Sequence, residues 1–226
     1  DGIDVIFGGP GADNVYGGTG GTIELPDQNF CLLFGNLLFG GPDDDTLRGD
    51  YLNWDANDPR GGIDVIFGAG GIDTIEGAAG SLIIIGDITS GQAIVIGFGN
   101  ILFGGPGSDN IYGADAASVC TGVSDDLDDF LDALGVTDLG GAADLIFCGG
   151  GDDVAFAYDG IDFVFGSDGM DTLDGEEGGF IIVPISGVPT PIAFGNLMFG
   201  GDDDDTIRSL GRVGLISIPP AETDLL

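Results

Sequence analysis

The chain has 226 residues, long enough for one large domain, and its 39 acidic and 4 basic side chains give a formal net charge of −35. This charge argues against nucleic acid as a partner, because phosphate binding needs clustered Lys and Arg. Histidine is absent and no hydrolase or nucleotide-binding motif occurs, so we expect no enzyme. Hydrophobic residues nevertheless make up 43% of the chain, which is inconsistent with an acidic disordered protein.

Residues 4–17 contain the unit from which the chain is built. Asp4 and Asp13 lie nine residues apart, each two places before an aliphatic residue, and a glycine-rich turn separates them. Pairs with the same spacing recur at Asn36/Asp45, Asp64/Asp73, Asn100/Asp109, Asp144/Asp153, Asp162/Asp171 and Asn196/Asp205. Seven copies with one spacing indicate an internal repeat, which takes precedence over other sequence signals.

Each nine-residue unit has a glycine-rich half, an acid at its sixth place and an aliphatic residue at its eighth, as in GGPGADNVY at 8–16. Glycines allow tight turns and close backbone approach. The acid adds carboxylate oxygens to the carbonyl oxygens of such a turn, and Ca²⁺ takes six to eight oxygens at about 2.3–2.6 Å. The last three residues predict a short strand with its aliphatic side chain inward, so two units make one coil of a β-solenoid.

These units resemble the RTX (repeats-in-toxin) calcium-binding β-roll, whose consensus is GGxGxDxUx. The resemblance covers most of residues 1–113 and 140–208 and implies an all-β, right-handed parallel β-solenoid that binds several Ca²⁺ ions between successive coils. Carried over by position, it nominates as calcium ligands Asp4, Asp13, Asp45, Asp64, Asp73, Asp109, Asp144, Asp153, Asp162, Asp171 and Asp205. Asn36, Asn100 and Asn196 replace the first acid in three pairs, where we expect no complete Ca²⁺ site. The alternative is that the acids only solvate turns, where Asp is favoured anyway.

Three apolar segments interrupt the repeat, at 21–34, 82–98 and 180–194. Each consists of two apolar runs joined by a turn that contains Gly, Pro or Asp, which predicts an inserted hairpin-like strand pair. Each segment ends in the sequence FGN, so every strand pair leads into one of the Asn-type pairs. The Ile-rich runs are too short to span a membrane, and we predict no membrane span.

The nine-residue register breaks between 113 and 140. Residues 123–138 have apolar side chains at helical spacing, with Ser124 as a predicted N-cap and Gly135 as a stop. This pattern predicts one short amphipathic α-helix packed on the solenoid, with a partner-binding helix as the alternative. We therefore predict a single domain over 1–226, with units near 1–62, 63–113 and 140–226 and a helical insertion at 114–139.

The chain has three cysteines, Cys31, Cys120 and Cys148. Cys120 and Cys148 flank the predicted helix, so a disulfide between them would attach the insertion to the solenoid, as an exported chain allows. Cys31 would then be unpaired. Two buried free thiols are the alternative, because connectivity cannot be deduced from sequence alone.

The strand triplets fall into two classes. After the first acid of each pair all three places are apolar, and phenylalanine ends every triplet: Phe7, Phe39, Phe67, Phe103, Phe147, Phe165 and Phe199. A sheet of such triplets is apolar on both faces, so we expect the Ile-rich strand pairs or another subunit to cover it. The other triplets are mostly polar–apolar–polar, typical of a sheet solvated on one face. Their Thr/Asn file, which Val154 interrupts, resembles that of ice-binding solenoids: Asn14, Thr46, Thr74, Asn110, Thr172 and Thr206. The alternative is the ordinary β-propensity of a solvated face.

Together these patterns predict an extracellular, calcium-dependent structural protein: a surface adhesin, a matrix protein or a filament subunit that self-associates through its solenoid ends or apolar sheet. The alternatives are an ice- or glycan-binding RTX module and the non-catalytic repeat domain of a secreted enzyme. The predicted mechanism is linkage, in which extracellular Ca²⁺ neutralises the carboxylates and drives folding, while scarce Ca²⁺ inside the cell leaves a repelling chain. The tail at 214–226 resembles the C-terminal type I secretion signals of RTX proteins.

Overall fold

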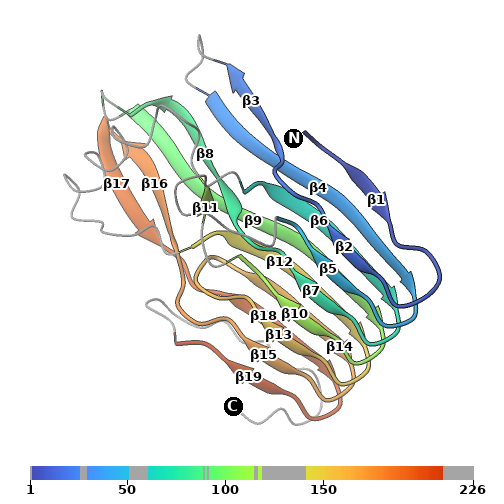
Figure 1. Ribbon diagram of the computed structural model, residues 1–226. Coiled ribbons are helices and arrows are strands. Elements are labelled where there is room, and N and C mark those ends of the chain that lie inside the picture. Colours follow the sequence, from blue (N-terminus) through green and yellow to red (C-terminus); the bar gives the residue numbers. More distant parts are fainter. Residues whose placement is uncertain are drawn as a thin grey trace.

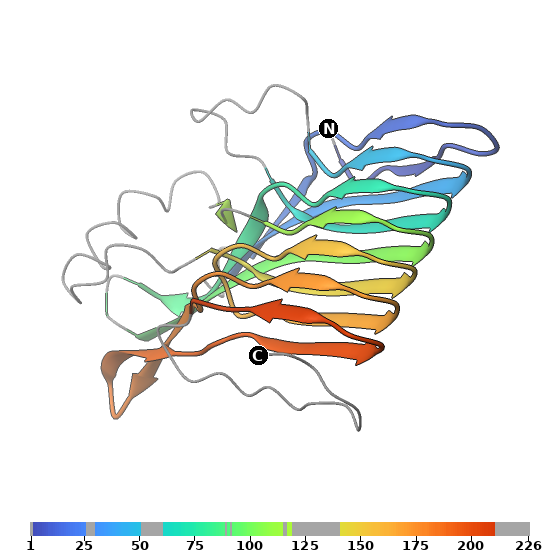
Figure 2. The same ribbon diagram turned by 90° about the horizontal axis from the view of Figure 1, so that it is seen from below.

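The computed structural model describes residues 2–25, 30–50, 61–88, 90, 92–114, 117–118 and 141–210. In these ranges the regular secondary structure is all β, and the chain winds through a stack of coils that Figures 1 and 2 show from two directions. Each coil adds one strand to each of two parallel sheets. The predicted all-β parallel solenoid is therefore confirmed, whereas its handedness and the single-domain division stay predictions.

The first sheet, here the apolar sheet, is built from the all-apolar triplets. Its coil strands are β1 (Val5–Phe7), β4 (Phe30–Pro42), β6 (Ile63–Gly70), β9 (Gln92–Pro106), β12 (Ala143–Gly150), β14 (Phe163–Asp168) and β18 (Leu197–Asp202). Neighbouring triplets pair in parallel with the same register at every step, so that Phe7 lies opposite Phe39 and Phe39 opposite Phe67. The constant nine-residue spacing within each pair explains this shared register.

The second sheet, here the polar-faced sheet, contains the other class of triplets. Its strands are β2 (Asn14–Tyr16), β5 (Thr46–Arg48), β7 (Thr74–Glu76), β10 (Asn110–Tyr112), β13 (Val154–Phe156), β15 (Thr172–Asp174) and β19 (Thr206–Arg208), and they follow one another along the sheet in chain order. All pairings are parallel, and they align the Thr/Asn file in register, as Thr46 opposite Thr74 illustrates.

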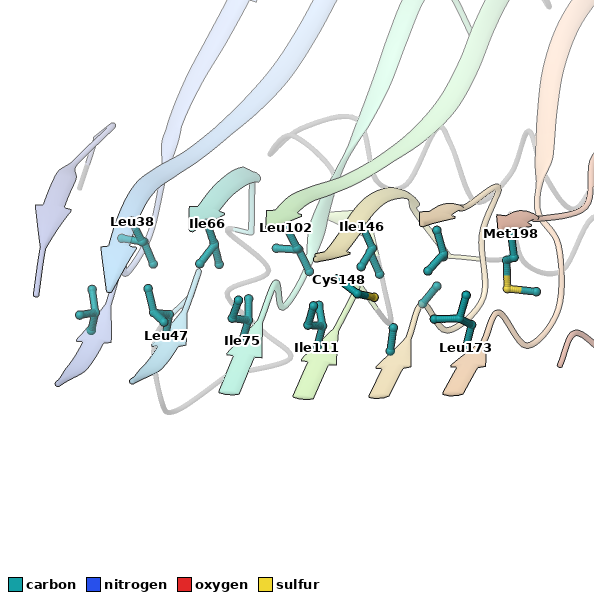
Figure 3. Close-up of a cluster of buried hydrophobic side chains, with 14 residues drawn as sticks. Leu38, Leu47, Ile66, Ile75, Leu102, Ile111, Ile146, Cys148, Leu173 and Met198 are labelled. Atoms are coloured by element: carbon teal, nitrogen blue, oxygen red, sulfur yellow. The ribbon is translucent and has the colours of Figure 1, made fainter. Parts of the chain in front are cut away.

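The hydrophobic core lies between the two sheets. The central residue of each triplet points inward, so that Leu38 and Ile66 of the apolar sheet face Leu47 and Ile75 of the polar-faced sheet (Figure 3). These four side chains are completely buried. Burial of one such side chain contributes about 1.5–3 kcal/mol, so every coil brings its own share of the core.

The inserted apolar segments form antiparallel strand pairs, as predicted. β3 (Gly21–Leu25) pairs with the first part of β4, β8 (Gly80–Asp87) with β9, and β16 (Phe180–Ile185) with β17 (Val188–Ala193). The three pairs also join one another, because β4 bonds to β8 and β9 bonds to β16. They form a wing that extends the apolar sheet beyond the coils (Figure 1), and β11 (Ala117–Ser118) adds a short strand to β8.

The expectation that the strand pairs cover the phenylalanine file is wrong. Each pair is hydrogen-bonded to strands of the apolar sheet, so it lies in the plane of the sheet and not over its face. The seven Phe rings stack along the outer face with centroids 4.5–5.1 Å apart and ring planes within 9° of parallel. Phe7, at the end of the file, is 69% exposed.

The predicted disulfide is not formed. Cys148 is a buried free thiol near the end of β12, and its side chain joins the core between the sheets (Figure 3). Cys120 and the helix predicted at 123–138 lie outside the described residues.

Candidate metal sites

The chain turns between the sheets at two edges. At the first edge it passes from the apolar to the polar-faced sheet through short turns at 8–13, 40–45, 68–73, 104–109, 148–153, 166–171 and 200–205. At the second edge it moves on to the next coil, and the wing and the longer insertions enter the chain there. Each edge carries one Asp or Asn side chain per coil.

At the first edge these side chains are all aspartates. The first file consists of Asp13, Asp45, Asp73, Asp109, Asp153, Asp171 and Asp205. Along the whole file the backbone N–H of one aspartate donates to Oδ1 of the aspartate in the next coil, at 2.7–2.9 Å. Each carboxylate after Asp13 therefore uses one oxygen to hold the preceding coil in register.

In six aspartates of the first file the second carboxylate oxygen lacks a donor among the described residues. Among the described residues, buried Oδ2 atoms without a hydrogen-bond partner occur in Asp13, Asp45, Asp73, Asp109, Asp153 and Asp171. At Gly8 an added Cβ would lie 2.9 Å from Oδ2 of Asp13 and 2.7 Å from the carbonyl oxygen of Gly40 in the next coil. The same cradle recurs at Gly40, Gly68, Gly104 and Gly166. Buried acceptors that face each other in this way need a cation or a proton between them.

Burial dominates the electrostatics of the first file. It raises the pKa of Asp153 to about 7 and the pKa of Asp109 and Asp171 to about 6. The hydrogen bond from the preceding coil lowers each pKa, and neighbouring carboxylates raise it again. A fully ionised file is therefore unfavourable unless positive charge is bound along it.

The donor set of these cradles suits calcium. It consists of carboxylate and backbone carbonyl oxygens, which are hard ligands, and Ca²⁺ tolerates irregular oxygen cages. In the described part of the chain no three acidic or cysteine side chains cluster as a metal-binding group. Carbonyl oxygens of the turns must therefore supply much of the coordination, and the chain provides them once per coil.

The second edge repeats the backbone arrangement with a different composition. The second file consists of Asp4, Asn36, Asp64, Asn100, Asp144, Asp162 and Asn196. Again each backbone N–H donates to Oδ1 of the next coil's side chain, at 2.5–3.1 Å. The two files therefore hold the coils together in the same manner through Oδ1. They differ at the asparagines, where the second terminal atom of the side chain is Nδ2 and not a carboxylate oxygen.

In the asparagines that atom is a donor. Nδ2 of Asn36 donates to the carbonyl oxygen of Gly18 at 2.8 Å and to that of Gly49 at 3.3 Å. Asn100 donates in the same way to Ala78, and Asn196 donates to the carbonyl of Gly175. The amide supplies the positive partner that the carbonyls need. That the three Asn positions hold no complete Ca²⁺ site stays a prediction.

A comparison with known families identifies the repeat. The model of the RTX calcium-binding nonapeptide repeat (4 copies) matches residues 1–22, 34–50, 60–87, 97–117 and 140–179, more than half of the chain. The chain belongs to this family. RTX repeats form calcium-dependent parallel β-rolls that bind multiple Ca²⁺ ions, so the predicted cofactor is confirmed.

RTX repeat proteins are typically secreted. Over the ranges that the structure describes, no helix is both long and apolar enough to cross a membrane. No curated protein and no solved structure matches the chain significantly.

The four acids of the second file have unlike surroundings. Asp4 is exposed at the first coil, and Asp144 has a donor for each oxygen, the N–H groups of Asn100 and Ala114. Asp64 and Asp162 are completely buried, and Oδ2 of each lacks a hydrogen-bond partner in the described structure. Burial raises the pKa of both well above the usual range, helped by the nearby charges of Asp50 for Asp64 and Asp144 for Asp162. Of the acids nominated at this edge, Asp64 and Asp162 therefore offer a buried carboxylate oxygen without a described partner, and their role as calcium ligands stays a prediction.

One further acid at this edge, Asp50, lies outside the positions that the repeat nominates. Asp50 is 7% exposed, and its Oδ1 lacks a hydrogen-bond partner in the described part of the chain. Burial raises its pKa to about 7, although the N–H of Ala79 and the charge of Arg48 both lower it. The available signal was its position, because Asp50 follows Gly49 at the second place of a nine-residue unit, where the RTX consensus has glycine.

Proposed function

We propose that this RTX chain is an extracellular structural protein, a subunit of a surface adhesin, matrix or filament, that folds on Ca²⁺ and then associates with copies of itself. It performs no catalysis in this proposal. The observation that carries the proposal is the open apolar face of the apolar sheet. Soluble monomers rarely expose a large continuous apolar patch, and such patches commonly mark interaction surfaces.

The open face continues from the coils into the wing. In β9, Val95 is buried while its neighbours Ile94 and Ile96 lie on the other side of the strand. Their partners in β8, Ile85 and Ile83, lie on that same side. The file of Phe rings covers the coil half of the face, and the exposed apolar side chains include Val5, Phe7, Ile85, Phe98, Phe163, Ile185 and Val188. The face therefore offers stacked rings and aliphatic side chains to a second copy.

Calcium links folding to this association. The chain carries a net charge of −35, and its first file places carboxylates in consecutive coils. Ca²⁺ between the coils offsets this repulsion and favours the compact state. In a cell interior poor in Ca²⁺ the chain stays extended and suited to export, and the type I route is part of this proposal.

The polar-faced sheet supports the alternative of ice binding less well. Its Thr/Asn file is in register, but the adjacent file on the same face carries ion pairs, Arg48–Glu76 at 3.0 Å and Arg208–Asp174 at 3.4 Å. Such charged side chains disturb the flat, regular surface that an ice lattice would match. A groove of about 320 Å³ beside Arg48, Glu76 and Tyr112 is the feature that favours a glycan instead, and a glycan array tests it.

Sedimentation velocity in millimolar Ca²⁺, with electron microscopy of the same sample, tests the proposal. Wild-type protein is expected to form oligomers or filaments. Phe67→Glu adds a charge to the centre of the open face and is expected to leave a folded monomer. Thr74→Glu adds the same charge to the outer face of the opposite sheet in the same coil, so it should associate like wild type. A wild-type protein that stays monomeric in Ca²⁺ would contradict self-association.

A further inference from the structure

We propose that Asp50 and Asp64 together form a Ca²⁺ site at the second edge, in which Asp50 contributes a carboxylate from outside the repeat's ligand position. The site lies between two coils whose file members are Asn36 and Asn100. It is therefore separate from the continuous first file. The inference depends on the calcium chemistry of the repeat and is independent of self-association.

Both side chains are buried with one oxygen engaged and the other unsatisfied. Asp64 is completely buried, and its Oδ1 accepts the N–H of Asn36 at 2.5 Å. Asp50 is 93% buried, and its carboxylate accepts the N–H of Ala79. Oδ2 of Asp64 and Oδ1 of Asp50 lack a hydrogen-bond partner within the described ranges. Burial of two such atoms without a positive partner is costly.

A backbone carbonyl lies beside the two carboxylates. An added Cβ at Gly49, the residue before Asp50, would lie within 3.0 Å of both Oδ2 of Asp64 and the carbonyl oxygen of Gly77. Asp50 is close enough that its charge raises the pKa of Asp64. Three separate parts of the chain thus bring oxygen atoms to one buried place at the second edge.

The preceding coil shows what this place requires. There Asn36 stands where Asp64 stands one coil later, and its Nδ2 donates to the carbonyls of Gly18 and Gly49. Gly18 occupies the position that corresponds to Asp50. At Asp64 the amide donor is replaced by an oxygen, and a second carboxylate replaces the glycine. The backbone carbonyl acceptors remain while the amide N–H donor is lost, so a cation is needed to pair with these oxygens.

Neither a proton nor Arg48 meets this requirement. A single proton shared by the two carboxyls supplies one O–H donor, which leaves another of the facing acceptors unsatisfied unless both carboxyls are neutral. Arg48 forms an ion pair with Glu76 at 3.0 Å on the outer face of the polar-faced sheet. A divalent cation matches the two carboxylate charges, and a set made only of oxygens favours Ca²⁺ over softer metals.

Ca²⁺ stoichiometry from calorimetry and native mass spectrometry tests the site, with Asp50→Asn as the first variant. This variant should bind one ion fewer than wild type, or bind that ion about tenfold more weakly or worse, since loss of even an outer partner costs that much. The matched control is Asp174→Asn, which removes the same charge from the ion pair with Arg208 on the outer face of the polar-faced sheet and should bind as many ions as wild type. Asp64→Asn installs the residue that the fold accepts at 36 and 100, and it too should lose one ion while staying folded by circular dichroism.

Terbium luminescence gives a local readout. The chain has one tryptophan, Trp54, which is four residues from Asp50 and so at most about 14 Å away along the chain. Tb³⁺ emission excited through tryptophan should appear in wild type and Asp174→Asn and vanish in Asp50→Asn. Equal numbers of bound ions in wild type, Asp50→Asn and Asp64→Asn would overturn the proposal. Tryptophan-sensitised Tb³⁺ emission that survives in Asp50→Asn would overturn it as well. Both outcomes leave the association experiment unaffected.

Discussion

The two edges of the solenoid solve one structural problem in two ways. In both files a backbone N–H bonds to Oδ1 of the next coil, and a backbone carbonyl faces the neighbouring side-chain atom. At the first edge that atom is always a carboxylate oxygen, whereas at the second edge it is the amide nitrogen in Asn36, Asn100 and Asn196. Exchange of a single atom thus decides whether a coil needs a cation.

The exchange follows the architecture of the second edge. Each of the three asparagines comes directly after a strand pair of the wing. The wing pairs are antiparallel and bonded to one another, so they hold those coils through their own backbone hydrogen bonds. We infer that the second edge of a coil with a wing strand pair is less dependent on calcium than the first edge of the same coil.

The largest expected effect is that of calcium removal. Chelation at neutral pH should abolish most of the β signal in circular dichroism, because the first file is left with buried, ionised carboxylates. Readdition of Ca²⁺ should restore the signal. Mg²⁺ should restore it poorly, since it demands near-octahedral geometry and keeps its waters. A β signal that is insensitive to chelator would contradict the calcium dependence of the first edge, because both edges would then be independent of metal.

The pH dependence should reverse sign with calcium. Burial raises the pKa of Asp153 to about 7 and that of Asp109 and Asp171 to about 6, above the unfolded value of about 3.9. In chelated protein their contribution to stability is therefore fully present below pH about 4 and is lost as the pH rises through 6–7. With Ca²⁺ the carboxylates must be ionised, so stability should fall on acidification. Denaturant titrations at several pH values check this, and equal slopes with and without Ca²⁺ would contradict it.

A smaller effect is expected from closing one cradle of the first file. Gly68→Ala would place its Cβ against Oδ2 of Asp73 and 2.7 Å from the carbonyl of Gly104. Overpacking of this kind costs about 1–3 kcal/mol, and Ca²⁺ affinity should fall as well. Gly70→Ala is the control, since its Cβ would meet only Pro106 at 4.0 Å. Urea unfolding in Ca²⁺ separates the two, and equal stabilities would show that the cradle is not required.

The smallest expected effect on stability in Ca²⁺ comes from exchanging Asn and Asp between the two files. Asn100→Asp removes the amide that donates to the carbonyl of Ala78 at 3.2 Å and leaves buried acceptors unsatisfied. Without Ca²⁺ this should cost about 1–3 kcal/mol, and Ca²⁺ should recover part of the loss. Asp45→Asn is the reciprocal exchange and should make the first edge less sensitive to chelator. Identical calcium dependence in both variants would show that the atom beside Oδ1 does not matter.

Much of this arrangement could be predicted from local sequence. The nine-residue spacing predicted both sheets, the inward central residues such as Leu38 and Leu47, and both files, because each place in the unit has one conformational role. The wing pairs followed from apolar runs joined by a turn. The position of Asp50 was visible, but its burial was not, because that depends on Asp64 and Ala79 in the next coil.

The sequence by itself determined the repeat, the two classes of strand and the acids available for calcium, since these depend on residues within one unit. Only the tertiary structure decided that the strand pairs lie beside the apolar sheet, that Cys148 points into the core, and that Asp144 is bonded to Ala114 while Asp64 is not satisfied. The physical reason is that a solenoid places partners from different coils together. Which donor meets which acceptor depends on how the insertions between coils bring the chain back to the stack.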